Sequence, residues 1–156
     1  MRYRKWFLAV VFLVGVLAPA ISSVQAQAIT TFDVPGSTRT FPTSINPAGE
    51  ITGLYSDSSL HGHGFVRDGR GAITSFDVPG STGTGPASIN PAGEITGSYG
   101  DSSGLHGFVR DARGTITSFD PPGSIATFTQ SINPAGEITG SYRDSTGTVH
   151  GFVRGR

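Results

Sequence analysis

Short runs of alternating apolar and polar residues fill the chain from Ile29 onward, and turn-forming residues separate them. An alternation with a period of two is typical of β-strands. In the middle of the chain, the runs at 73–78, 87–90, 94–99 and 106–110 each fit a strand. No segment of residues 29–156 has the hydrophobic period or the length of a helix. The pattern therefore predicts an all-β protein.

This set of four runs occurs three times, almost unchanged. The copies begin at Ile29, Ile73 and Ile116, which gives a period of 44 and then 43 residues. A period of this size indicates a repeat architecture. We expect one repeat domain over residues 29–156, with repeats at 29–72, 73–115 and 116–156. A residue that recurs in all three copies is first a requirement of the repeat and only then a candidate site.

The clearest local signal is the sequence Asn-Pro-Ala-Gly-Glu between the second and third runs of each repeat. The Asn side chain can bond to the backbone that follows it, and Pro suits the second position of a type I turn. The Gly can adopt the left-handed conformation of a bulged hairpin. We therefore predict three hairpins with these structural turn residues: Asn46 and Gly49, Asn90 and Gly93, and Asn133 and Gly136.

Aromatic residues also recur in register with the repeat, in three rows. The simplest interpretation is a core between neighbouring units, whereas a stacking platform for sugars or bases would need exposed rings. Gly97, in the middle of a predicted strand, requires a neighbour that packs close against it. The three rows are Phe32, Phe76 and Phe119; Tyr55, Tyr99 and Tyr142; and Phe65, Phe108 and Phe152.

Four strands in about 43 residues is the size of a propeller blade. Propellers usually have about 4–8 blades, so three are too few to close a ring. We expect propeller-blade-like repeats, with a homodimer completing a six-bladed ring. A β-trefoil with pseudo-threefold symmetry is the alternative, and an open arc of three units is a third arrangement. In either closed form, the last unit pairs with the strand Ile29–Val34, of the same chain or of a partner.

The N-terminus has the pattern of a secretory signal peptide over residues 1–28. Arg2, Arg4 and Lys5 precede an apolar run from Trp6 to Leu17, and an Ala-Gln-Ala cleavage signal ends at Ala28. Cleavage there leaves Ile29, the first residue of the first repeat, at the new N-terminus; cleavage after Ala26 is the second option. The apolar run is shorter than the roughly 20 residues of a membrane-spanning helix. We predict a secreted protein, extracellular or periplasmic, with no membrane attachment after cleavage.

Composition narrows the range of partners. All eleven acidic residues follow residue 28 but only eight of the eleven basic ones do, so residues 29–156 carry a net charge of −3. This balance disfavours nucleic acid, which binds to basic patches. The chain has no cysteine, so disulfides do not stabilise it. Of its 23 Gly and 10 Pro, all but Gly15 and Pro19 lie in the repeats, and this periodic use indicates turns rather than disorder.

One string recurs in each repeat: Ser-Ile-Asn-x-x-Gly-x-Ile-x-Gly, then Asp-x-x-Gly, His-x-Phe-Val and Asp-x-Pro-Gly. It resembles the HAF repeat family, which is named for a His-Ala-Phe signature. Here the signature reads His-Gly-Phe at residues 63–65, 106–108 and 150–152. The resemblance covers residues 29–156 and implies a secreted bacterial β-repeat protein, but no activity.

The repeated polar residues have structural explanations that we prefer to catalytic ones. His63, His106 and His150 could converge as a zinc-type triad, but a bond from each imidazole to the nearby Asp-Ser turn is simpler. One Asp opens each turn, at residues 57, 101 and 144, which is weak support for calcium and typical of Asx-turn capping. We therefore predict no cofactor. The glutamates at 50, 94 and 137 fit solvated strand ends, and no nucleophile-elbow sequence occurs.

The best binding candidates lie where the repeats differ, mostly at 38–43 and 125–130. Differences between repeats tend to gather on one face, often the binding face, although drift in a tolerant loop also explains them. The candidates are Arg39, Phe41, Phe128 and Gln130. We predict a non-catalytic module that binds a glycan or a protein, or has a structural role at the cell surface. The alternative is an extracellular glycosidase or lyase that uses the repeated acidic residues.

Overall fold

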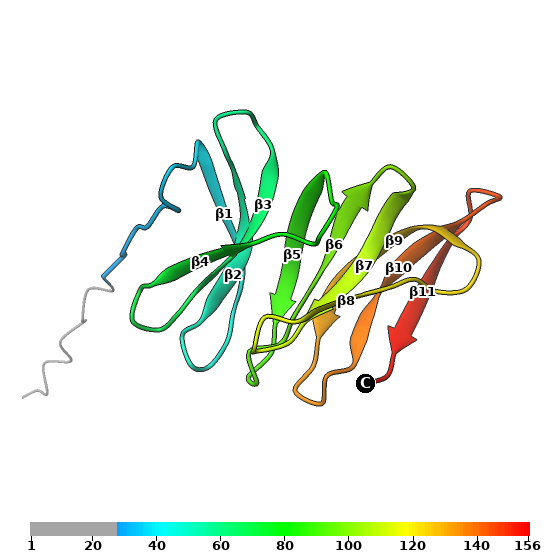
Figure 1. Cartoon of the computed structure of the whole chain (residues 1–156). Coiled ribbons are helices and arrows are strands. Elements are labelled where there is room, and N and C mark those ends of the chain that lie inside the picture. The colour runs from blue at the N-terminus through cyan, green and yellow to red at the C-terminus, as the bar shows by residue number, and fades with distance from the viewer. Residues whose placement is uncertain (1–27) are drawn as a thin grey trace, which may run out of the picture. The chain divides into compact units, whose positions relative to one another are not determined.

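The structure is a computed structural model that describes residues 28–156 of the chain (Figure 1). These residues form eleven β-strands. No helix occurs among these residues, so the all-β prediction is confirmed. The predicted signal peptide lies, apart from Ala28, outside the described residues. Within the described part of the chain, no helix is long and apolar enough to cross a membrane.

The strands form three successive antiparallel meanders, which we call blades 1, 2 and 3. The two sheets of the fold run β1-β2-β3-β4 and β11-β10-β9-β7-β6-β5, with β8 on β7. A single parallel pair, Leu105 with Ala126, joins the last two blades.

Blade 1 consists of β1 (Arg39–Ile45), β2 (Ile51–Ser56), β3 (Gly62–Arg67) and β4 (Ile73–Phe76). Blade 2 consists of β5 (Gly83–Ile89), β6 (Ile95–Asp101), β7 (Gly104–Arg110) and β8 (Ile116–Phe119). Blade 3 consists of β9 (Ser124–Ile132), β10 (Ile138–Asp144) and β11 (Val149–Arg154).

This topology matches propeller-like blades and not a β-trefoil. Each blade is a simple meander in which consecutive strands pair, and within residues 28–156 no ladder joins different blades apart from the Leu105–Ala126 pair. A trefoil would require strands of different repeats to pair in one barrel. The trefoil alternative is therefore wrong.

The blades are offset from the sequence repeats. The run that opens a repeat was expected to be its own first strand, but β4 pairs with β3 of the preceding blade, with Arg67 opposite Ile73 and Gly64 opposite Phe76. β8 pairs with β7 in the same register. Ile29–Val34, the corresponding run of repeat 1, forms no strand, because the described residues contain no preceding blade with which it could pair.

The three predicted hairpins form as expected. In each turn the Asn Oδ1 accepts hydrogen bonds from two backbone N–H groups, as Asn90 does from Ala92 at 3.0 Å and from Glu94 at 2.9 Å. Gly93 has a φ of 78°, a left-handed conformation that favours glycine. The same bonds recur at Asn46 and Asn133.

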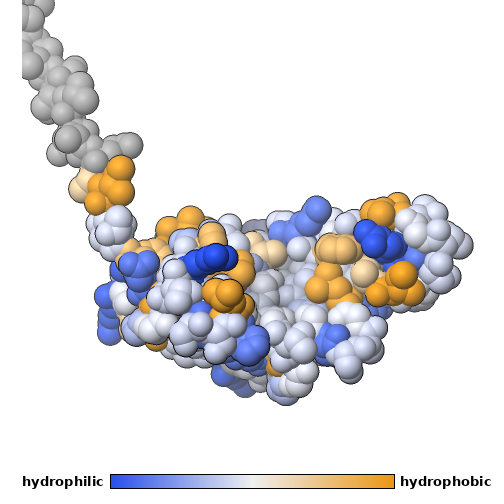
Figure 2. Space-filling model, turned by 90° about the horizontal axis from the view of Figure 1, so that it is seen from above, coloured by the Kyte–Doolittle hydropathy of each residue, from blue (hydrophilic) through white to orange (hydrophobic). Residues whose placement is uncertain are grey.

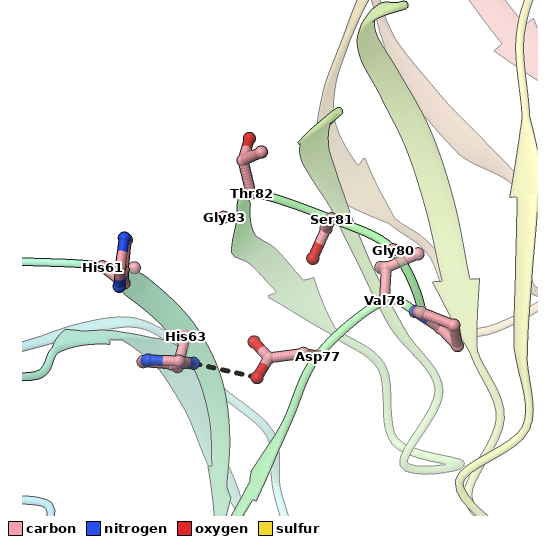
Figure 3. Close-up of a pocket in the computed structure, with 10 residues that line it drawn as sticks. His61, His63, Asp77, Val78, Gly80, Ser81, Thr82 and Gly83 are labelled. Carbon is pink, nitrogen blue, oxygen red and sulfur yellow. Dashed lines mark hydrogen bonds and ion pairs between the residues drawn. The ribbon is translucent and has the colours of Figure 1, made fainter. Parts of the chain in front are cut away.

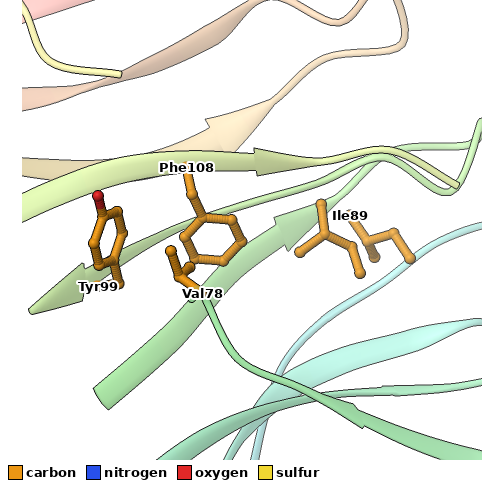
Figure 4. Packing of buried hydrophobic residues seen from close by; sticks show 5 residues of the cluster. Val78, Ile89, Tyr99 and Phe108 are labelled. Atoms are coloured by element: carbon orange, nitrogen blue, oxygen red, sulfur yellow. The ribbon is translucent and has the colours of Figure 1, made fainter. Parts of the chain in front are cut away.

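The hydrophobic core is centred on blade 2 (Figure 4). Ile95 and Phe108 are fully buried, and Ile89 and Val78 pack against them. The Phe108 ring packs directly against Gly97. A Cβ at residue 97 would lie only 2.6 Å from that ring, so the absence of a side chain there makes room for it. The expectation of a close neighbour at Gly97 is thus confirmed.

The blades are linked by contacts that repeat with the sequence. Phe76, on the last strand of blade 1, packs edge-on against Phe108 of blade 2, with 6.2 Å between ring centroids. Phe119 of blade 2 packs against Phe152 of blade 3 in the same way, at 6.0 Å. The prediction of an aromatic core between units is therefore confirmed for the two rows of phenylalanines to which these residues belong. The side-chain amide of Asn46 donates to the carbonyl of Asn90 at 3.1 Å, which adds a polar link between blades 1 and 2.

Candidate functional site

The four predicted binding residues lie on strands and not in loops. Arg39 and Phe41 belong to β1, and Phe128 and Gln130 belong to β9. The sequence left a tolerant loop open as the competing explanation for this variable stretch, but the stretch belongs to the first strand of each blade, as in β5, which begins at Gly83. All four side chains are exposed, and Phe41 and Phe128 keep 48% and 38% of their surface in contact with solvent.

Phe41 and Phe128 occupy equivalent positions, opposite Leu54 and Ser141 respectively in the neighbouring strands. Gly85 takes this position in β5, so the middle blade presents no side chain there. Gln130 is the bulged residue of β9, where the register with β10 shifts, and bulges often redirect a side chain beside a functional site. In Figure 2, hydrophobic residues gather in separate areas of the visible face with more polar surface between them.

The three repeated histidines do not converge. Each lies in its own blade, beside an Asp-capped turn, and stacks on a tyrosine. His63 and His106 lie 5.1 and 5.3 Å, centroid to centroid, from Tyr55 and Tyr99. His150 is hydrogen-bonded through Nε2 to Asp144 at 3.0 Å. Among the described residues, no group of three or more His, Asp or Glu is arranged to hold a metal ion.

Two of these histidines have a second carboxylate partner, which the sequence did not suggest. The Nδ1 of His63 bonds to Asp77 at 2.8 Å, and the Nδ1 of His106 bonds to Asp120 at 2.6 Å. Both aspartates come directly after the strand that opens a repeat. The available signal was the recurring Asp-x-Pro-Gly, which Asp33 begins in the first repeat.

These hydrogen bonds shift the pKa values of His63, His106 and Asp144. The hydrogen bond to Asp77 raises the pKa of His63 above its usual range, and Asp120 has the same effect on the pKa of His106. Both carboxylates favour the charged imidazolium. The hydrogen bond from His150 lowers the pKa of Asp144. When protonated, the imidazoles of His63 and His106 act as electrostatic links within the fold.

An open groove of about 410 Å³ lies beside the His63–Asp77 pair (Figure 3). His61 and His63 line one side, and the loop from Asp77 to Gly83 lines the other. His61 lies in the loop before β3 and contributes to this wall. Its lining includes the hydroxyls of Ser81 and Thr82, which are hydrogen-bonded to Thr84 and to the carbonyl of Gly100.

The repeated glutamates also remain apart. Glu50, Glu94 and Glu137 line three different surface cavities. Each accepts a hydrogen bond of 2.7 Å from the Asn of its own turn. They were expected to be solvated strand ends, but Glu50 and Glu94 are half-buried because the next blade packs against them. The turn aspartates cap their own backbone, as Asp101 does with Ser103, so this geometry gives calcium no additional support.

These observations define a class: an all-β repeat protein built from propeller-like blades. No family model and no curated protein matches this chain. The resemblance to HAF repeats therefore stays a prediction.

Among solved structures, the chain is similar to a catalytically inactive virginiamycin B lyase from Staphylococcus aureus, crystallised with quinupristin. The two chains are 15% identical with a TM-score of 0.47. The match covers 72% of this chain and 41% of the lyase, so this chain spans less than half of that protein. This likeness carries no functional argument.

Proposed function

We propose that this protein is an exported, non-catalytic β-repeat module that binds a glycan or a protein outside the cytoplasm. The observation that carries the proposal is the exposure of Phe41 and Phe128 at equivalent positions of β1 and β9. Large aromatic side chains usually bury most of their surface, and exposed ones are enriched in binding sites. In the middle repeat, glycine replaces the aromatic ring.

Polar groups accompany both rings. Arg39 lies two residues before Phe41, on the same side of β1. Gln130 lies two residues after Phe128, at the bulge. An aromatic face with hydrogen-bonding groups at its edge suits a sugar ring, which has apolar C–H faces and hydroxyls around its rim.

A glycan array probed with residues 28–156 tests this proposal. We expect retention of a defined set of glycans and a loss of at least about tenfold in affinity for Phe41→Ala and Phe128→Ala. Leu60→Ala is the control, because Leu60 is an exposed apolar residue of the turn between β2 and β3 and belongs to neither β1 nor β9. If no glycan on the array binds, the proposed ligand becomes a protein. If glycan binding survives both Phe substitutions, Phe41 and Phe128 are not the binding site.

The alternative of a glycosidase or lyase requires two carboxylates about 5–10 Å apart across a cleft. The three repeated glutamates line separate cavities and do not form such a pair, and the Glu94 carboxylate lies 3.1 Å from the guanidinium of Arg156. Incubation of the protein with oligosaccharides tests the alternative. Turnover that disappears in Glu94→Gln would establish it.

We further propose that residues 1–28 direct export. Expression of the full chain in a bacterium with a secretory pathway should place the protein outside the cytoplasm. N-terminal sequencing should then read from Ile29, or from Gln27 if cleavage follows Ala26. Retention of Met1 in the exported protein would contradict cleavage.

A further inference from the structure

The first and last blades expose two complementary halves of a contact that the chain already makes twice. Between successive blades, an Ile of the later blade packs against the earlier one, and a backbone N–H beside it bonds to a Ser. Ile89 and Ile132 are each only 6% exposed in these contacts. Their N–H groups lie 3.3 and 3.4 Å from Ser44 and Ser88. Ile45 is the equivalent residue of blade 1 and is 65% exposed.

Blade 3 exposes the opposite half. Asn46 and Asn90 are buried, and each donates to the Asn carbonyl of the next blade, whereas Asn133 is exposed. Val153 is 74% exposed, although its counterparts in β3 and β7 are half-buried. Gly151 is also exposed, whereas the equivalent residues Gly64 and Gly107 are buried.

The outer edge of blade 3 and residues 29–32 also lack a pairing partner within the described residues. The outer edge of β11 has no partner strand among the described residues, whereas β3 and β7 pair there with β4 and β8. Those partners read Ile-Thr-Ser-Phe. The sequence Ile-Thr-Thr-Phe at residues 29–32 is almost the same and forms no strand in this chain.

We propose that residues 29–32 and the exposed face of blade 1 dock on β11 and blade 3 of a second copy of this chain. Two copies that do so reciprocally form a closed dimer of six blades, a number within the usual range of propellers. The register of this proposed pairing is taken from the register of β4 with β3. Arg154 lies opposite the partner's Ile29, Val153 opposite the partner's Thr30, and Gly151 opposite the partner's Phe32.

The side chains of both surfaces fit this arrangement. An open cavity of about 490 Å³ next to Gly151 is lined by Phe119, Tyr142 and Phe152. In blade 1 the equivalent place is filled: a Cβ at Gly64 would lie 2.9 Å from the Phe76 ring and 3.0 Å from Pro86. The partner's Phe32 and Pro42 occupy the corresponding positions in the dimer.

The hydrogen bonds of the repeated histidines also differ between the last blade and the other two. His63 and His106 each bond through Nδ1 to the Asp that follows the next repeat's opening strand. The described residues supply no such Asp for His150, which bonds only to Asp144. In the dimer the partner's Asp33 provides it. The proposal does not depend on ligand binding, so either can fail without the other.

Sedimentation equilibrium of residues 28–156 measures the assembly directly. We expect the mass of two chains at micromolar concentration. Gly151→Val should reduce this to the mass of one chain, because a Cβ there lies 4.0 Å from the Gly140 carbonyl oxygen in the single chain, an ordinary contact, but meets the partner's Phe32 in the dimer. Gly62→Val is the matched control, because nothing lies within 4 Å of a Cβ there and repeat 3 already has Val149 at this position.

Ile45→Glu provides a second disruption on the opposite face, and Leu60→Glu is its control because both residues are 65% exposed. Circular dichroism of each variant checks that the single chain remains folded. A mass of one chain for the unchanged protein, or masses that grow with concentration as in an open polymer, would overturn the proposal. So would a Gly151→Val variant that remains a dimer.

Cross-linking tests the register. Because the chain has no cysteine, Thr30→Cys combined with Val153→Cys reports on one contact only. We expect oxidation to link two chains, since these residues face each other directly. Thr31→Cys with Val153→Cys is the control, because adjacent strand residues point to opposite faces. Equal cross-linking by both pairs would refute the proposed register.

Discussion

At the scale of single residues, the repeated polar groups form links between neighbouring parts of the backbone. Asp57 caps its own turn through the N–H groups of Ser59 and His61, and its other oxygen lies 3.3 Å from His63. His63 also bonds to Asp77, beyond the end of β4. One imidazole thus joins the turn before β3 to the loop that leads into blade 2, which gives the histidine a structural role.

Stability should decrease as the pH rises through the pKa of these histidines. Hydrogen bonds to Asp77 and Asp120 raise the folded-state pKa of His63 and His106 above the unfolded value near 6.5. The stabilisation is therefore complete below about pH 6.5 and is lost as the pH passes the folded pKa. Urea denaturation between pH 6 and 9 measures this change. Asp120→Asn should bring the NMR-determined pKa of His106 back toward 6.5, and an unaltered titration would contradict the assigned cause.

Gly97→Ala should destabilise the protein by about 3 kcal/mol, at the upper end of the usual cost of overpacking. The added methyl group meets the Phe108 ring and the backbone carbonyl of Gly85, and the carbonyl cannot move without breaking its strand. Thermal denaturation measures the loss. Gly62→Ala is the control, with an expected change below about 0.5 kcal/mol. Equal melting temperatures for both variants would disprove the close packing.

At the scale of the elements, the Asn-Pro-Ala-Gly hairpin has two functions. Its Asn organises the turn through Oδ1 and, in blades 1 and 2, joins the next blade through Nδ2. Its left-handed Gly lets the chain reverse in few residues. The hairpin is therefore a local turn and an inter-blade contact, which explains why its sequence is the same in all three copies.

Asn90→Ala should cost about 2–4 kcal/mol of unfolding free energy. The side chain is almost completely buried, and its removal leaves the N–H groups of Ala92 and Glu94 and the carbonyl of Asn133 without partners. Chemical denaturation measures the effect. Pro91→Ala, at an exposed position of the same turn, should cost less than about 1 kcal/mol. A larger effect for Pro91 would show that the turn geometry, and not the buried amide, provides the stability.

At the scale of the whole molecule, stability is unevenly distributed among the blades. Blade 2 packs against a blade on each side and contains the main core cluster, whereas blades 1 and 3 each have one exposed face. In repeat proteins the stability of a unit depends on its contacts with its neighbours. The middle blade should therefore be the last part of a single chain to open.

Hydrogen exchange should show this order. In the Gly151→Val background, which we expect to be monomeric, amides of β6 and β7 should exchange most slowly and those at the outer edge of β11 most rapidly. In the unchanged protein the β11 amides should become protected as the dimer forms. Uniform protection across all three blades in the monomer would contradict nearest-neighbour stabilisation.

The sequence by itself determined the properties that depend on neighbouring residues. The period of two indicated the strand type, and the Asn-Pro-Ala-Gly signal located the hairpins at Asn46, Asn90 and Asn133. Gly97 indicated a close contact. The repeat period suggested blades and an aromatic core, because each copy must bury the same face against the next.

Only the tertiary structure decided how these elements combine. It assigned Ile73–Phe76 to the preceding blade, placed Phe41 and Phe128 on strands, and separated the three histidines into different blades. It also supplied Asp77 as the partner of His63. Three nearly identical copies of a sequence cannot show which edge pairs with which strand, because that depends on contacts between residues far apart in the chain. The unequal exposure of Ile45 and Ile89, two identical residues in equivalent positions, arises from their neighbours alone.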